Sequence, residues 1–217
     1  MRRVPVDPVT PAADVLEVAA AAIRGGGLVV LPTDTLYGLA ADPFSRSAVH
    51  RVFSLKGRQP GQALPLIACD SEQVARAVGK LSGAARALAD RFWPGPLTLL
   101  LLAPDTIAVE ATGGTGRIGV RVPNHHVAVA LCRVCNRPLT ATSANLSGQP
   151  PSSDPAVVAG GLATVEDQID VMLDAGPTPG GAPSTVVDVS GAEPRLVRAG
   201  AVPWNEIQAC LNLPPAN

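Results

Sequence analysis

Short apolar runs, each bounded by glycine or proline, alternate along this chain with longer alanine-rich stretches. Residues 28–31 follow three glycines and precede Pro32, and residues 97–103 follow a Trp-Pro-Gly-Pro turn. Runs this short are typical of buried strands, whereas residues 12–24 are long enough for a helix. Aromatic residues make up only 3% of the chain, so the core must be built from Ala, Val and Leu. The pattern predicts an α/β fold.

Helices and strands are predicted throughout the 217 residues, without a strict alternation of the two. The predicted helices cover residues 12–24, 47–55, 71–78, 82–92, 125–134 and 204–211. The predicted strands cover residues 28–31, 64–69, 97–103, 117–122, 138–142, 169–173, 185–189 and 195–197. We therefore predict one twisted mixed sheet surrounded by helices, in a single domain. Thr10 and Ser71 are predicted to cap the helices that follow them.

Charge and cysteine content narrow the classes of protein that this chain can represent. The net charge is −1, so charge alone does not imply tight binding to nucleic acid. Four cysteines in a chain of this length do not form a disulfide framework and fit a reducing compartment. We see no signal peptide and no apolar run near the roughly 20 residues of a membrane span. We expect a soluble, cytoplasmic protein without a membrane partner.

Three sets of basic residues are candidates for binding an anion. Lys56 and Arg58 stand two residues apart at a predicted helix end, where a phosphate chain would relieve their repulsion. A solvated helix end is the competing interpretation. Arg117 and Arg121 share one face of a predicted strand, so one can face solvent and the other a ligand. Arg198 can likewise face either solvent or a ligand.

Polar side chains also follow two predicted strands. Thr33, Thr35 and Tyr37 come after the strand at residues 28–31, and Ser143 and Asn145 come after the strand at residues 138–142. Ligands of open α/β sheets usually sit at such strand ends. Ordinary turns and caps are the alternative interpretation. Neither a GxxxxGK[ST] loop nor a GxGxxG loop is present.

A CxxC pair, Cys132 and Cys135, follows His125 and His126 by about two helical turns. Zinc needs four ligands in a suitable geometry, and this pattern on one helix does not supply it. We interpret both cysteines as core residues and predict no metal site.

Six ordered segments together resemble the YrdC-like family, the threonylcarbamoyl-AMP synthases, over residues 12–200. They are PTDTLYGL, KGR, WPGPLTL, GVRVP, TSANLSG and STVVD. The resemblance implies a YrdC-like catalytic domain at residues 12–200 with a concave basic cleft. It leaves residues 1–11 as an N-terminal extension and residues 201–217 as a C-terminal helix and tail packed on the same domain.

The resemblance also implies an activity. Enzymes of this family are nucleotidyltransferases that condense L-threonine, bicarbonate and ATP to threonylcarbamoyl-AMP and pyrophosphate, with Mg²⁺ on the ATP. The product serves N6-threonylcarbamoyladenosine modification of tRNA. Implied partners are therefore ATP, L-threonine, bicarbonate and tRNA, the last met directly or through a downstream transferase complex.

The matching motifs assign residues to each substrate by resemblance. The expected ATP-binding residues are Lys56, Arg58, Ser143, Asn145 and Arg198. The expected threonine-binding residues are Thr33, Thr35, Tyr37, Arg121 and Ser184. The expected catalytic residues are Lys56, Arg58 and Arg121.

The chain departs from the family pattern at two places. Gln59 and the segment Gln62-Ala63-Leu64 replace a Pro and a titratable residue before Pro65, which puts local ligand contacts in doubt. We also expect a short form without the additional C-terminal domain of longer family members.

Two other functions fit parts of the pattern. A YrdC-like module could bind double-stranded RNA or tRNA without catalysis, because shape-based RNA binding needs mainly phosphate contacts. A carbamoyl-adenylate enzyme of hydrogenase maturation contains a related domain, but we expect a chain of 217 residues to lack its further segments. The cation and hydroxyl sets favour the synthase.

Overall fold

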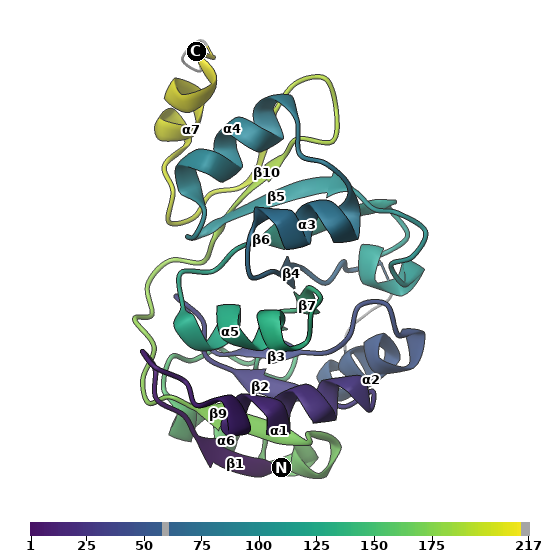
Figure 1. Cartoon of the computed structure of the whole chain (residues 1–217), viewed down its shortest axis with the longest axis vertical. Coiled ribbons are helices and arrows are strands. Elements are labelled where there is room, and N and C mark those ends of the chain that lie inside the picture. Colours follow the sequence, from purple (N-terminus) through teal and green to yellow (C-terminus); the bar gives the residue numbers. More distant parts are fainter. Residues whose placement is uncertain (58–60, 214–217) are drawn as a thin grey trace.

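Two mixed β-sheets follow one another along the long axis of the molecule (Figure 1). The computed structural model describes residues 1–57 and 61–213. The five-stranded sheet has the order β1 (Arg2–Pro5), β9 (Val171–Asp174), β2 (Val29–Leu31), β3 (Gly38–Ala40) and β8 (Thr142–Ser143). The six-stranded sheet has the order β11 (Arg195–Arg198), β10 (Thr185–Asp188), β5 (Leu97–Leu102), β6 (Arg117–Arg121), β4 (Leu66–Ile67) and β7 (Leu139–Thr140). The α/β class is confirmed, and the prediction of a single sheet is wrong.

The division into two sheets has a local cause in the segment predicted as one strand at residues 138–142. β7 pairs antiparallel with β4 in the six-stranded sheet. One residue later, β8 pairs antiparallel with β3 in the five-stranded sheet. Ala141, between them, donates its N–H to the Pro65 carbonyl at 2.8 Å. We call residues 139–143 the shared strand, because this one extended segment serves both sheets.

Parallel and antiparallel pairs occur in both sheets. In the five-stranded sheet, β9 pairs in parallel with β1 and β2, and β3 pairs antiparallel with β2. In the six-stranded sheet, β5 pairs in parallel with β10 and antiparallel with β6, and β6 pairs in parallel with β4. β10 and β11 form an antiparallel pair.

Helices cover the sheets and follow the predicted pattern closely. The α-helices are α1 (Ala13–Arg24), α2 (Arg46–Lys56), α3 (Ser71–Val78), α4 (Gly83–Phe92), α5 (His126–Val134), α6 (Pro155–Gly161) and α7 (Trp204–Leu211), with 3₁₀ turns η1 (Val109–Thr112) and η2 (Ala163–Gln168). The two predicted caps are wrong. Ala12 precedes α1 without a side-chain cap, and Asp70 caps α3 by accepting from the Gln73 N–H at 2.7 Å.

Alternating side chains of residues 28–31 contribute to two buried clusters on opposite faces of the five-stranded sheet. Val29 and Leu31 pack with α1 and α5. Leu28 and Val30 belong to the larger cluster, which continues through the six-stranded sheet. Because one cluster includes both sheets, the chain forms a single domain.

Both ends of the described chain are integrated into this domain. Residues 1–11 were expected to form an N-terminal extension, but β1 pairs with β9 along the edge of the five-stranded sheet. The polar segment Arg2–Pro5 carries no alternating apolar pattern, which is why the sequence does not reveal this edge strand. At the other end, α7 lies beside α4 and buries Ile207 (Figure 1). Within residues 1–57 and 61–213, no helix has the length and apolar character needed to cross a bilayer.

Candidate ligand-binding site

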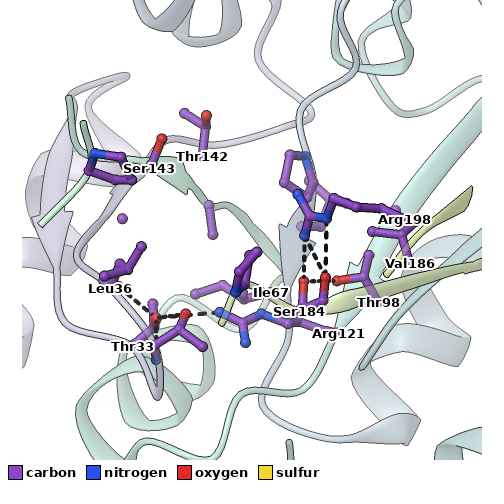
Figure 2. A pocket seen from close by; sticks show the side chains of 18 of the residues that line it. Thr33, Leu36, Ile67, Thr98, Arg121, Thr142, Ser143, Ser184, Val186 and Arg198 are labelled. Carbon is purple, nitrogen blue, oxygen red and sulfur yellow. Dashed lines mark hydrogen bonds between the residues drawn. The ribbon is translucent and has the colours of Figure 1, made fainter. Parts of the chain in front are cut away.

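A cavity of about 450 Å³ lies between the two sheets, and Figure 2 shows it from close by. One wall comes from the turn after β2 and from β3 and β8, and the other from β4, β5, β6 and β10. The volume is in the range of small-molecule sites. Seven of the residues predicted from the sequence line it: Thr33, Thr35, Tyr37, Arg121, Ser143, Ser184 and Arg198. Arg58 lies outside the described residues.

Arg121 connects the two walls of the cavity. It is the last residue of β6, and its side chain points toward Thr33 in the opposite wall (Figure 2). Nη1 donates to Asp34 Oδ1 at 2.9 Å, and Nη2 donates to Thr33 Oγ1 at 3.3 Å. The residue is 9% exposed. Burial lowers the pKa of Arg121, and the charge of Asp34 opposes this effect.

Arg198 lies on the other side of the cavity and is bound to Ser184 (Figure 2). Its Nη2 donates to the Ser184 carbonyl at 2.6 Å and to Ser184 Oγ at 3.1 Å. Ser184 Oγ is also 2.8 Å from Thr98 Oγ1. Burial lowers the pKa of Arg198. Among the described residues no carboxylate pairs with Arg198, so the cavity has a cation held in place by neutral oxygens.

Gly200 allows this arrangement through a close backbone approach. A Cβ atom at this position would lie 2.3 Å from the Pro183 carbonyl oxygen and 2.6 Å from Ser184 C. Since both neighbours are backbone atoms, they cannot move aside as a flexible side chain would. Gly200 therefore lets the segment after β11 lie directly against Ser184.

Lys56 is buried beneath the loop that carries Ser143 and Asn145. The sequence offered a solvated helix end as the alternative, but the lysine is only 6% exposed. Its Nζ donates to the carbonyls of Ser143 and Asn145 at 2.5 and 2.7 Å, and to Asn145 Oδ1 at 3.1 Å. Ser143 Oγ also donates to Asn145 Oδ1, at 2.5 Å. Lys56 therefore fixes the loop, and Ser143 alone of these three residues lines the cavity.

Tyr37 lines the cavity, but its hydroxyl group is bonded to the protein. The hydroxyl donates to the Gly176 carbonyl at 2.7 Å and accepts from the Ala175 N–H at 3.1 Å. Burial raises the pKa of Tyr37 to about 12. The hydroxyl therefore anchors the segment after β9 in place of contacting a ligand.

Replacing Tyr37 with phenylalanine is expected to lower stability without affecting ligand binding. Two partly buried backbone groups, the Ala175 N–H and the Gly176 carbonyl, lose their partner, at a cost of about 1–3 kcal/mol in the free energy of unfolding. Urea unfolding measures the first effect, and calorimetric titration with L-threonine, the amino acid that the family resemblance implies, measures the second. An unchanged stability together with threonine binding weakened about tenfold or more would instead assign the hydroxyl to the ligand.

The segment at residues 176–183 joins the sheets and contacts the cavity wall. Thr178 Oγ1 donates to the Thr35 carbonyl at 2.8 Å, and the Gly180 N–H donates to the same oxygen at 2.9 Å. The Thr178 N–H donates to the Ser153 carbonyl at 2.9 Å. Thr35 therefore contributes its backbone to the fold, while its side chain lines the cavity.

Sequence reasoning missed several residues at this site. Thr98 lines the cavity from the otherwise apolar strand β5, and its hydrogen bond with Ser184 depends on the pairing of β5 with β10. Asp34 stands in the predicted turn but had no assigned partner. A polar residue within a buried apolar run is the available sequence signal for Thr98. The apolar part of the lining, including Ile67, Leu100 and Val186, had no separate signal.

The cysteines of the CxxC pair are core residues, as predicted. Cys132 and Cys135 pack in the cluster beneath α1 and α5. Burial raises the pKa of Cys135 to about 11 and raises the pKa of Cys132 well above its ordinary value. Both thiols are therefore protonated and unreactive at neutral pH.

Comparison with known proteins assigns this chain to a protein family. A family model for Sua5, YciO and YrdC, described as telomere recombination, matches residues 21–200. The chain belongs to the Sua5/YciO/YrdC family.

Named relatives and a solved structure agree with this placement. The chain is 38% identical over 196 residues to the threonylcarbamoyl-AMP synthase of Pyrococcus abyssi, covering 89% of this chain and 56% of that protein. A Mycobacterium leprae protein, provisionally given the same name, is 38% identical over 200 residues, covering 92% and 89%. The structure of P. abyssi Sua5 complexed with L-threonine matches with a TM-score of 0.90 at 35% identity, covering 97% of this chain and 61% of that one. The chain thus spans little more than half of the Pyrococcus protein.

Proposed function

We propose that this chain is a threonylcarbamoyl-AMP synthase, which joins L-threonine, bicarbonate and ATP and releases pyrophosphate. Membership of the Sua5/YciO/YrdC family and the names of its relatives support this activity. The similarity to the L-threonine complex of P. abyssi Sua5 supports threonine as the amino acid.

The observation that carries the proposal is the unequal environment of two arginines in one cavity. Arg121 is paired with Asp34, whereas Arg198 contacts only the uncharged oxygens of Ser184 among the described residues. A cation without a charged protein partner is suited to a phosphate, which guanidinium groups bind through paired N–H donors. We assign the Arg198 side to ATP and the Arg121 side to the threonine carboxylate.

The reaction needs alignment and charge neutralisation more than a reactive side chain. The threonine amine combines with bicarbonate to give a carbamate and water. A carbamate oxygen then attacks the α-phosphorus of MgATP, forming a new P–O bond while the bond to pyrophosphate breaks. Two anions must approach each other, so fixed cations and hydroxyl donors lower the barrier by positioning and electrostatic stabilisation. Ser143 Oγ donates to Asn145 Oδ1, and no base accepts its proton among residues 1–57 and 61–213, which argues against a covalent intermediate.

Lys56 acts on the ATP side by holding the loop of Ser143 and Asn145 in place. Its three contacts with this loop fix the hydroxyl of Ser143 at the cavity wall. Mg²⁺ enters as MgATP, bound to the phosphates of the substrate. The role of Arg58 stays a prediction.

The product is a mixed anhydride and therefore an activated acyl donor for an amine. We propose that it serves tRNA modification, directly or through a downstream transferase complex, in the cytoplasm. The basic character of the cleft and direct tRNA contact stay predictions.

Pyrophosphate release from MgATP, with L-threonine and bicarbonate each present or omitted, tests the proposed activity. Release that needs both substrates, together with a product of the mass of threonylcarbamoyl-AMP, is the expected result. L-Serine is the matched control, and we expect much slower release with it because it lacks the methyl group. Absence of release by folded protein that still binds ATP or RNA would contradict the synthase and favour a binding module.

A further inference from the structure

The ion pair between Asp34 and Arg121 joins the two sheets across the cavity. Arg121 ends β6 in the six-stranded sheet, and Asp34 lies in the turn that links β2 and β3 of the five-stranded sheet. Both side chains are largely buried, with 10% and 9% of their surfaces exposed. The guanidinium group is therefore held from the opposite wall of the site.

The Asp34 carboxylate acts mainly on Arg121. His125 also faces Asp34, but burial lowers the pKa of His125, so the imidazole is neutral at neutral pH. Arg198 lies near enough to Arg121 to repel it, yet no carboxylate pairs with Arg198 in the described part of the chain. The two arginines therefore have different electrostatic surroundings. The ion pair of Arg121 with Asp34 has no net charge, whereas Arg198 keeps its positive charge.

The geometry of Arg121 leaves donors for a ligand. A guanidinium group has five N–H donors. Two of them donate to Asp34 and Thr33, and the remaining three have no acceptor among residues 1–57 and 61–213. Because Arg121 lines the cavity, a carboxylate in the cavity can accept from these donors while Asp34 keeps its own contact.

We propose that Asp34 is a positioning residue that fixes the orientation of Arg121 and, by neutralising it, limits how tightly the cavity binds the amino-acid carboxylate. Fixing the orientation strengthens binding, and the negative charge weakens it. The balance keeps the affinity for threonine moderate, so that the cavity can fill and empty in each turnover. This inference rests on the proposed function, in which Arg121 meets the threonine carboxylate.

Two substitutions at position 34 separate these two effects. Asp34→Asn keeps an oxygen acceptor for Nη1 but removes the charge, so the dissociation constant for L-threonine is expected to fall about tenfold. Asp34→Ala removes both, so its dissociation constant is expected to exceed that of Asp34→Asn by about tenfold or more. Calorimetric titration with L-threonine measures these constants, and the dissociation constant of MgATP should change less than about threefold in either variant.

Asp42→Asn is the matched control. Asp42 is buried and pairs with Arg137 at 2.6 Å, outside the cavity. This variant is expected to melt at a lower temperature and to bind threonine as the wild type does. If Asp34→Asn does not fold, Asp34→Glu keeps the charge and displaces it by one methylene, and the dissociation constant for threonine is expected to rise about fivefold.

The outcomes distinguish this inference from the proposed function. Wild-type protein that binds threonine, with equal dissociation constants in wild type, Asp34→Asn and Asp34→Ala, would overturn the role of Asp34 alone. Equal weakening in both variants would also overturn it, because a merely structural role predicts that result. Wild-type protein that binds no threonine in the presence of MgATP would contradict the proposed function and, with it, this inference.

Discussion

Replacing Arg121 with glutamine is expected to raise the KM for L-threonine about 100-fold and the KM for ATP less than about threefold. The loss of a charged donor to a carboxylate corresponds to about 2–3 kcal/mol. The variant also leaves Asp34 buried without its cation, which costs about 3–5 kcal/mol of stability. Pyrophosphate release at varied threonine and ATP concentrations gives both constants, with the melting temperature measured alongside to identify conditions where the variant is folded.

Arg117→Gln is the matched control for Arg121→Gln, because Arg117 lies four residues earlier on the same face of the strand. Its side chain is 51% exposed and pairs with Asp188 at 3.0 Å. Exposed ion pairs contribute about 0.2–1 kcal/mol, so we expect less than a threefold change in either KM. Equal rises in the two constants for Arg121→Gln would contradict its assignment to threonine.

Replacing Lys56 with methionine is expected to reduce kcat/KM for ATP about 100-fold or more. Methionine fills similar space but leaves the acceptors of Ser143 and Asn145 without the ammonium group, at about 1–3 kcal/mol for each buried acceptor. The loop then loses its fixed position. ATP must order the loop when it binds, and the entropy lost in doing so weakens ATP binding. Steady-state pyrophosphate release and calorimetric titration of MgATP measure the effect.

Lys80 is the only other lysine in the chain and provides the control for Lys56→Met. It is exposed at the turn after α3, so Lys80→Met should leave both stability and kinetics nearly unchanged. A Lys56→Met variant that keeps the wild-type kcat/KM for ATP would show that the loop is fixed by its other contacts.

The strand at residues 117–122 shows how far periodicity predicts a site. The alternation places Arg117 and Arg121 on one face of this strand, and the structure buries Ile118 and Val120, on the opposite face, in the core. Periodicity does not distinguish the two arginines. Arg117 is the first residue of β6 and lies near Asp188, whereas Arg121 is the last residue and lies where the strand reaches the cavity. That difference depends on which strands lie beside β6, and neighbours in a sheet come from distant parts of the sequence.

The remaining differences between prediction and structure have the same origin. Asp34 and Arg121 are 87 residues apart, so no local pattern predicts their contact. The helix-end position of Lys56 is typical of an exposed lysine, and only the packing of the Ser143 loop over it makes it buried. Tyr37 was correctly placed at the cavity, but the direction of its hydroxyl depends on the segment after β9.

The shared strand at residues 139–143 constrains how the cavity can change shape. Covalent bonds fix the distance between β7 and β8, so the walls cannot separate at this point by sliding apart. At the shared strand, the two sheets can therefore change their relative angle but cannot move apart. Insertion of a single residue at Ala141 would reverse the side chains of Thr142 and Ser143 relative to the cavity.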